Sequence, residues 1–364
     1  MTISEIVSYL ETLAPPALQE SYDNAGLITG SPDWACSGII CSLDTTEKVV
    51  DDAMAKGCNL IVAHHPIIFK GLKKITGKNY VERTIIKAIQ NNIAIYAIHT
   101  NLDSVINGVN GMMADKLGLQ HQEILVPKSG QLKKLYCYVP VTHLANVKEA
   151  VFAAGAGQIG NYSECSFAVN GVGTFKPNDG ANPFSGEVGQ CHEDEEQKLE
   201  VLFPAWLEAA VLKAMWQNHP YEEVAYEVIT LDNVHQLTGL GIVGELPEAV
   251  TESDFLGILK ETFGLSVVRH TALLGKKVKK VSLCGGAGSS FISHAIASKS
   301  DVYVTADVKY HEFFDADGRI LLADIGHFES EQFTIDLLYA QLLQKFPNFA
   351  VLKTAINTNP VFYF

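Results

Sequence analysis

The sequence lacks the features that mark secreted and membrane proteins. Its seven cysteines are scattered and form no C-x-x-C pair, so they indicate neither a disulfide framework nor a thiolate zinc site. No apolar run approaches the roughly 18 residues that a membrane span requires. The segment MTISEIVSYLETLAPP carries Glu5 and Glu11 within an apolar helical pattern, which is typical of an amphipathic helix and not of a signal peptide. We therefore expect a cytoplasmic protein that does not enter membranes.

Positive charge is also scarce. The 27 Lys and Arg residues stand against 41 Asp and Glu residues, which gives a formal net charge of −14. A protein that holds nucleic acid through its phosphates needs a basic surface, so general nucleic-acid binding is not expected. The 47% hydrophobic content is that of a folded protein. Because domains usually contain roughly 100 to 200 residues, a chain of this length predicts two or three of them.

Both ends of the chain alternate short apolar runs with helical patterns. GIICSLD precedes TTEKVVDDAMAKG, NLIVAHHP precedes ERTIIKAIQNN, and KVSLC and DVYVTAD resume the pattern near the other end. This rhythm predicts one α/β domain formed by residues 1–127 and 237–364. Residues 128–236 instead follow a β-α-β-β-α-β order, which predicts an inserted small α+β domain of the ferredoxin-like, split β-α-β kind. Within it, the acidic run HEDEEQ is interpreted as a solvated turn.

Histidines and carboxylates follow three of the predicted strands. Ligands collect at the carboxyl ends of strands in open α/β sheets, so we expect these side chains to meet at one sheet edge. Neutral imidazole suits Zn, Fe or Mn better than Mg. The alternative is a pair of partly exposed loop histidines beside an ordinary acidic residue in a first helical turn. The candidate metal ligands are His64, His65, Asp103, His327 and Glu331.

The placement of these histidines and carboxylates favours two metal ions over one. Successive side chains on extended backbone point in different directions, so His64 and His65 would more naturally serve two divalent ions. We expect His327 and Glu331 to share one face of a helix that continues through SEQFTIDLLYAQLL. Two ions held by five protein groups retain open positions for water or substrate oxygen, and such centres suit hydrolysis.

Four further residues near predicted strand ends are candidate catalytic residues. They could orient a ligating histidine or accept a proton. The two aspartates among them could instead only cap helices. These residues are Asp44, His99, Asp307 and His311.

The run CGGAGSS is a second candidate binding element. It follows a strand and precedes a helix, so its backbone N–H groups could receive a phosphate at Gly285, Gly286, Gly288 and Ser289. A dinucleotide site is an alternative, since Asp307 stands about where a ribose-binding acid would, but the third glycine of G-x-G-x-x-G is absent. The glycines could also simply pack a helix against a strand.

Taken together, seven motifs resemble the NIF-three-like family, whose members are often labelled GTP cyclohydrolase I type 2 homologues. They are SYDNAGL, SLDTT, AHHP, HTNLD, CGGAGSS, ADVKYH and GHFESE, in the family's order. The middle segment resembles the extra domain of the long bacterial members, through GAGQIGNYSECSF, GVGTFKP and HPYEEVAYEV. Two positions depart from the family pattern, with Tyr22 in place of Trp and Ala306 in place of Gly.

The resemblance implies a di-metal site carried by the five candidate ligands, within a homohexameric toroid. It also implies that the inserted domain is similar to signalling proteins of the nitrogen-regulator and copper-tolerance type. We therefore expect a metal-dependent hydrolase of a nucleotide or another phosphate-bearing small molecule. The alternative is a non-catalytic regulatory or scaffold protein that senses a metal or a metabolite.

Overall fold

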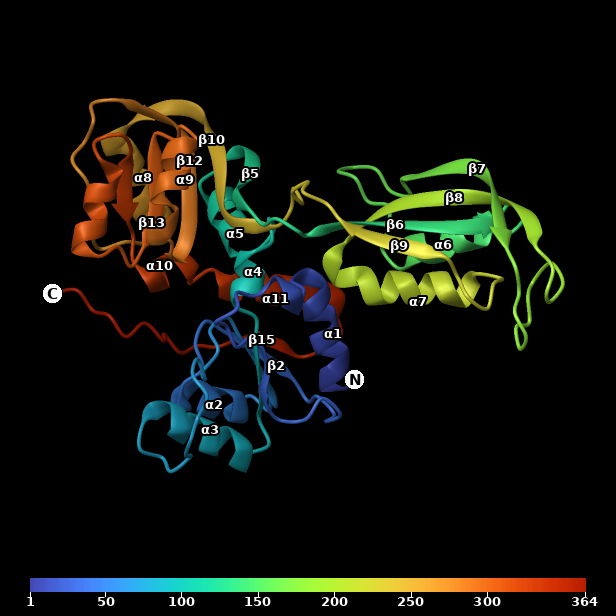
Figure 1. Cartoon of the computed structure of the whole chain (residues 1–364). Helices are drawn as coiled ribbons and strands as arrows, with labels where there is room; N and C mark the ends of the chain where they lie inside the picture. Colours follow the sequence, from blue (N-terminus) through green and yellow to red (C-terminus); the bar gives the residue numbers. More distant parts are fainter. The chain divides into compact units, whose positions relative to one another are not determined.

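The computed structural model describes all residues 1–364, and they form two compact units (Figure 1). Residues 1–126 and 237–364 make the first unit, which carries a five-stranded and a six-stranded sheet. Residues 127–236 make the second unit, which carries a four-stranded sheet. The α/β fold predicted for the two ends of the chain is confirmed.

The five-stranded sheet is mainly parallel. Its strand order is β1 (Gly26–Thr29), β4 (Ala94–Ala97), β3 (Leu60–Ala63), β2 (Ile39–Ser42) and β15 (Val351–Lys353), and only β1 runs antiparallel to its neighbour. Every residue of β2, β3 and β4 is buried, as expected for parallel strands covered on both faces. Helices α1 (Ile3–Leu13) and α11 (Thr334–Lys345) pack on one face, and α2 (Glu47–Ala55) and α3 (Tyr80–Gln90) on the other.

Helix α1 shows how the sequence specifies these elements. Thr2 and Glu5 form a capping box at its start, so two of the unpaired N–H groups of the first turn are satisfied. Ile3, Ile6 and Leu10 recur at helical spacing and are fully buried against the sheet. The predicted amphipathic helix is therefore confirmed.

The six-stranded sheet carries the second half of the same unit. Its strand order is β11 (Arg269–His270), β14 (Leu321–Asp324), β13 (Val302–Ala306), β12 (Lys277–Ala287), β10 (Gly239–Thr251) and β5 (Gln120–Pro127). Strands β12, β13 and β14 are parallel, whereas β11 runs antiparallel to β14 and β10 runs antiparallel to β12.

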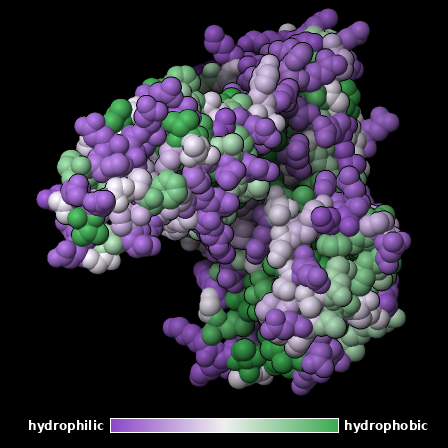
Figure 2. Space-filling view, turned by 90° about the vertical axis from the view of Figure 1, so that its right-hand side faces the viewer, coloured by the Kyte–Doolittle hydropathy of each residue, from purple (hydrophilic) through white to green (hydrophobic).

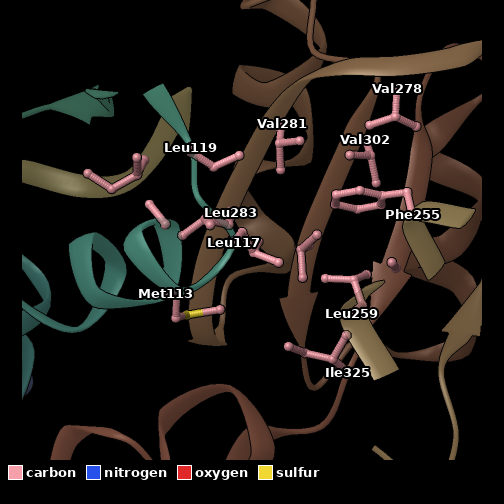
Figure 3. Close-up of a cluster of buried hydrophobic side chains, with 14 of the residues drawn as sticks. Met113, Leu117, Leu119, Phe255, Leu259, Val278, Val281, Leu283, Val302 and Ile325 are labelled. Carbon is pink, nitrogen blue, oxygen red and sulfur yellow. The ribbon is translucent and has the colours of Figure 1, made fainter. Parts of the chain in front are cut away.

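One face of this sheet packs on α5 (Val109–Lys116) and α8 (Glu252–Phe263), and α9 (Ile292–Ala297) contributes to the core of the other face. Figure 3 shows Met113 of α5 and Phe255 and Leu259 of α8 in one cluster with side chains of the strands, including Val281 and Val302. Replacing a buried phenylalanine such as Phe255 by alanine would cost about 3–5 kcal/mol. This core fixes the positions of β13 and β14, and therefore of the residues that follow their carboxyl ends.

The second unit has the element order β6 (Leu132–Pro140), α6 (Leu144–Ala153), β7 (Ser166–Phe175), β8 (His192–Pro204), α7 (Glu208–Asn218) and β9 (Tyr226–Thr230). Its sheet order is β7-β8-β6-β9 with antiparallel pairing throughout. Both helices pack on one face, as Figure 1 shows, and their buried side chains include Val147, Val151 and Val211.

The interpretation of HEDEEQ as a turn is wrong. The run forms the start of β8, where His192 pairs with Phe175 and Glu196 pairs with Gly171 on β7. Pairing in this long hairpin satisfies the backbone, and Glu193 and Glu195 project their charges into solvent while the strand continues. A run of acidic residues is therefore compatible with an exposed strand as well as with a turn, and the run alone does not distinguish the two structures.

The molecular surface carries both hydrophilic and hydrophobic residues. Figure 2 shows hydrophilic residues over most of one face of the molecule, with hydrophobic residues in smaller groups among them. None of the helices combines the length and the apolar character needed to cross a membrane.

Candidate metal centre

The candidate ligands lie where parallel strands of the two sheets end. His64 and His65 directly follow β3, Asp103 lies on the short helix α4 (Thr100–Asp103) after β4, and His327 and Glu331 begin and end α10 (His327–Glu331) after β14. The expectation of a single sheet edge is wrong, because β3 and β4 belong to one sheet and β14 to another. The β-α rhythm is the same in both segments, so it did not reveal that their strands pair separately.

His64 is the most deeply buried of the candidate ligands. Its side chain is 0% exposed, and its Nδ1 lies 2.9 Å from the carbonyl oxygen of Ile98. A carbonyl can only accept, so Nδ1 donates to it and Nε2 is the ring nitrogen that faces the cluster. That Nε2 atom is buried without a hydrogen-bond partner. An unsatisfied buried polar atom costs about 1–3 kcal/mol, and a bound cation would satisfy it.

His65 and His327 are oriented by carboxylates. Nδ1 of His65 lies 2.8 Å from Oδ1 of Asp44, and Nδ1 of His327 lies 2.8 Å from Oδ2 of Asp307. Their Nε2 atoms lie 3.0 Å and 3.1 Å from Oε2 of Glu331. Such carboxylate–histidine pairs fix the ring orientation and the tautomer of metal-ligating histidines. Asp44 and Asp307 thus lie behind the candidate ligands.

His99 is a fourth histidine at the same place. Its Nδ1 lies 2.7 Å from Oδ1 of Asp23, whose side chain is fully buried. The ligating atoms of His64, His65 and His99 lie within 4.8 Å of one another. Sequence reasoning singled out His99 but missed Asp23, which lies 76 residues earlier in an irregular segment. The hydrogen bonds of Asp23 to His99 and Thr100 outweigh its burial and lower its pKa to about 2.

Two further groups complete the cluster. His64, Asp103 and Glu331 form one, and His65, His327 and Glu331 form the other, each with its ligating atoms within 4.8 Å. Oδ1 of Asp103 lies 3.7 Å and Oε2 of Glu331 lies 3.9 Å from Nε2 of His64. Because Glu331 belongs to both groups, its carboxylate could contact two neighbouring cations.

Glu331 shifts the pKa values of several other groups in the cluster. Burial opposes a charge on His65, but its contacts with Asp44 and Glu331 outweigh burial and raise its pKa to about 9. The same balance raises the pKa of His327 to about 11. Burial and the negative charge of Glu331 raise the pKa of Asp103 to about 7, while the surrounding histidines hold the pKa of Glu331 well below its usual value despite burial. Positive charge at this position is therefore stabilised by the carboxylates around it.

The glycine loop packs directly against the cluster. Gly286 has a φ of +61°, and a side-chain carbon at this position would collide with Oε1 of Glu331. The loop's N–H groups already have partners within the protein: Gly285 donates to Asn110, Gly286 to Ser330, and Gly288 to Thr305. These contacts give the glycines a packing role beside Glu331.

The proposed phosphate-binding role of Gly285, Gly286, Gly288 and Ser289 stays a prediction. Ser289 begins a short 3-10 helix, η3 (Ser289–Phe291), ahead of α9.

The remaining predicted residues divide into those at the centre and those outside it. Asp44, His99 and Asp307 line the cavity at the cluster. His311 lies on the 3-10 helix η4 (Tyr310–Ala316), where its exposed ring contacts Tyr310 and Phe314, and it does not line that cavity. Its catalytic role stays a prediction.

The expected helix that continues from His327 through SEQFTIDLLYAQLL is two separate helices in the structure. His327 and Glu331 do share a face, as expected for positions i and i+4. The helix nevertheless ends at Glu331, and α11 begins at Thr334. Between them, the side chain of Gln332 donates to the carbonyl oxygen of Phe263, a contact that ties this junction to the end of α8.

The cluster opens into a cavity of about 650 Å³. Its walls include the aromatic side chains of Tyr22, Phe69 and Phe328, and the guanidinium-bearing Arg269. Tyr22 and Phe69 are 74% and 54% exposed, so both rings are accessible from solvent. Cavities of this size accommodate small molecules, and a few polar groups among apolar walls are typical of ligand sites.

The fold and these contacts define a class of protein: an α/β protein with a candidate metal centre of histidines and carboxylates where parallel strands of two sheets end. The model of the family described as Duf34/NIF3 (NGG1p interacting factor 3) matches residues 1–360. The chain belongs to this family, and the resemblance inferred from the seven motifs is confirmed.

Individual relatives match over most of their length. A Halalkalibacterium halodurans protein named GTP cyclohydrolase 1 type 2 homolog is 41% identical over 325 residues, covering 88% of this chain and 87% of that protein. A Bacillus subtilis protein of the same name is 41% identical over 313 residues, covering 86% and 84%. The crystal structure of a Bacillus cereus protein related to NIF3 is similar with a TM-score of 0.88 and 38% identity, over 100% of this chain and 99% of that one.

Proposed function

We propose that the protein binds two divalent metal ions at this centre and hydrolyses a nucleotide or another phosphate-bearing small molecule. One observation carries the proposal. Each of the three candidate histidine ligands uses Nδ1 for an acceptor outside the cluster, so their Nε2 atoms are left for the centre that Asp103 and Glu331 share. Rings arranged in this way are prepared to bind cations, and their outer hydrogen bonds raise ligand basicity.

The donor set favours Zn, Fe or Mn over Mg. Imidazole nitrogens outnumber carboxylates here, whereas Mg²⁺ prefers oxygen ligands and retains its waters. In the bound state, divalent ions of this kind supply Lewis-acid activation of water and of substrate oxygen.

The chain's own residues supply orientation and proton handling. Asp44 and Asp307 hold the rings of His65 and His327 in place. The His99–Asp23 pair lies beside the candidate ligands and has the hydrogen-bonded geometry of an imidazole general base. We therefore propose His99 as the group that accepts or returns a proton during hydrolysis.

Two features of the cavity lining support an aromatic, phosphate-bearing substrate. Tyr22 and Phe69 offer exposed ring faces against which a heterocycle could stack. Arg269 is 53% exposed and paired with Asp324 at 2.9 Å, and it lines the same cavity. Its guanidinium could contact a phosphate, for which its planar fork is suited.

Metal content and turnover should be measured together to test this function. We expect the wild-type protein to bind divalent metal and to hydrolyse at least one member of a panel of nucleotides and phosphoesters. His64→Ala should lose both, whereas His294→Ala, which alters an exposed histidine of α9 that does not line the cavity, should retain both. Turnover that survives in metal-free protein would rule out the proposed chemistry. Metal binding without any turnover would favour the sensing function instead.

The homohexameric ring and the cytoplasmic location stay predictions. Light scattering on the purified chain would measure the assembly directly, and a mass other than six chains would contradict the hexamer.

A further inference from the structure

The segment that follows β15 runs along a fixed path toward the candidate metal centre. The N–H of Thr354 donates to the carbonyl oxygen of Cys41 at 3.0 Å. The hydroxyl of Thr354 and the N–H of Ala355 both donate to Oδ2 of Asp52, at 2.7 Å and 3.0 Å. Ile356 packs against the core beneath α2 and α3. These contacts fix the chain just before it reaches the centre.

Beyond these contacts, Thr358 reaches the carboxylate that orients His65. Its hydroxyl donates to Oδ2 of Asp44 at 2.6 Å, while Oδ1 of Asp44 lies 2.8 Å from Nδ1 of His65. Each oxygen of the carboxylate thus has its own partner. A carboxylate held at one oxygen can rotate about its side chain, but one held at both oxygens keeps its plane. The imidazole that donates to it then keeps its orientation too.

The same three-part arrangement occurs a second time in the centre. Oδ1 of Asp23 lies 2.7 Å from Nδ1 of His99, and its Oδ2 accepts the hydroxyl of Thr100. Two of the four histidines are therefore held by a threonine–aspartate–histidine chain. In the second chain the threonine is adjacent to its histidine in sequence, whereas Thr358 lies 314 residues from Asp44.

The orientation of the Asp44 carboxylate depends more on a threonine hydrogen bond than that of the Asp23 carboxylate does. The side chain of Asp44 is 34% exposed, whereas that of Asp23 is fully buried and also accepts the N–H of Thr100. Water can compete for the oxygens of an exposed carboxylate. The hydroxyl of Thr358 occupies the oxygen that His65 does not use.

The residue after Thr358 contacts the opposite side of the centre. The side-chain amide of Asn359 donates to Oε1 of Glu329 at 3.1 Å, and Glu329 lies on α10 between His327 and Glu331. Consecutive residues of one segment thus contact the carboxylate behind His65 and the helix that carries His327. The segment lines the cavity through Asn359 and the residues that follow it.

We infer that Thr358 is a positioning residue of the metal centre, which acts through Asp44 to hold His65 ready for a cation. The inference rests on the proposed metal-binding function. It assigns the segment after β15 a role in metal affinity that is separate from its contribution to folding.

Cobalt binding tests this inference, because Co²⁺ reports both affinity and ligand geometry through its visible absorption. Thr358→Val retains the shape of the side chain but removes the hydroxyl. We expect its Co²⁺ affinity to fall by up to about tenfold, because Thr358 acts through Asp44 and the 10- to 100-fold effect applies to a partner that bonds the ligand itself, and we expect its absorption spectrum to change. Thr358→Ser restores a hydroxyl and should restore both measurements to wild-type values.

Thr354→Val is the matched control, because Thr354 makes the same kind of hydroxyl–carboxylate bond in the same segment, away from the cluster. It should keep the wild-type affinity and spectrum. The inference is overturned if Thr358→Val binds Co²⁺ as the wild type does, or if both valine variants lose affinity equally. Thr358→Ala replaces Thr358→Val should the latter fail to fold. A wild-type chain that binds no Co²⁺ would contradict the metal centre itself and this inference with it.

Discussion

The Nε2 atoms of His65 and His327 lie 3.3 Å apart, although the two residues are separated by 262 positions in the chain. Oε2 of Glu331 lies within 3.1 Å of each, so one carboxylate oxygen faces two imidazole nitrogens. In the absence of a cation, protons on the two rings provide the positive charge that this oxygen needs. A bound metal would take the place of those protons.

Replacing Glu331 by glutamine should remove metal from the whole cluster. The carboxylate belongs to two of the three candidate ligand groups, so its loss affects both proposed ions. We expect metal affinity to fall at least about 100-fold, since a direct ligand contributes more than the outer partners whose loss costs about 10- to 100-fold. Elemental analysis of metal per chain measures the effect. Glu261→Gln changes an exposed glutamate of α8 and should leave the metal content unchanged.

Metal affinity should rise with pH. The pKa of His65 is raised to about 9 and that of His327 to about 11, so at neutral pH a cation must displace protons from both rings. For each proton that metal binding releases, the metal affinity rises by up to about tenfold per pH unit. Competition with a chelator of known pH dependence, from pH 6.5 to 9, would measure this slope. A flat profile would show that the rings are already neutral in the metal-free protein.

The stability of the metal-free protein should change in the opposite direction. His65 has a folded-state pKa of about 9, above its ordinary value of 6.5. Its charge therefore stabilises the fold fully below about pH 6.5, and this contribution is lost as the pH rises through about 9. We expect the metal-free protein to unfold at a lower temperature at pH 9 than at pH 6.5. Asp44→Asn, which removes the nearest acceptor of His65, should reduce the difference between the two temperatures.

The sequence was sufficient to single out the candidate ligands and two aspartates that orient them, Asp44 and Asp307, but not Asp23 or Thr358. His64, His65, His327 and Glu331 follow apolar runs that become β3 and β14, and strand ends are where ligand-binding residues gather. Thr358 and its partner Asp44 are brought together only by the completed fold. Local patterns predict such elements and their ends, whereas contacts across hundreds of residues depend on packing that periodicity does not encode.

The same reasoning explains the errors in the predicted fold. Periodicity predicts the strands of both α/β segments, but it carries no information on which strands pair, so it does not separate the two sheets. Strand β8 begins with an acidic run whose charges project into solvent from a paired backbone. That run is a strand because its backbone pairs with β7. Composition alone does not indicate this pairing.

Gly286 offers a direct test of how closely the glycine loop is fitted to Glu331. A methyl group at this position would collide with Oε1 of Glu331, and the residue also has a φ of +61°. Gly286→Ala should therefore cost about 1–2 kcal/mol from the left-handed backbone alone, and it should also displace the carboxylate and weaken metal binding. Gly264→Ala is the matched control, because Gly264 has a φ of +64° at the end of α8 with open space around it.

Denaturant unfolding and Co²⁺ titration of the two glycine variants separate backbone strain from the effect on the centre. Both variants should lose stability from the strained backbone, but only Gly286→Ala should lose affinity for Co²⁺. Equal affinities in the two variants would show that Glu331 can move away from the loop and still contact a cation. The close approach of Gly286 would then serve packing alone.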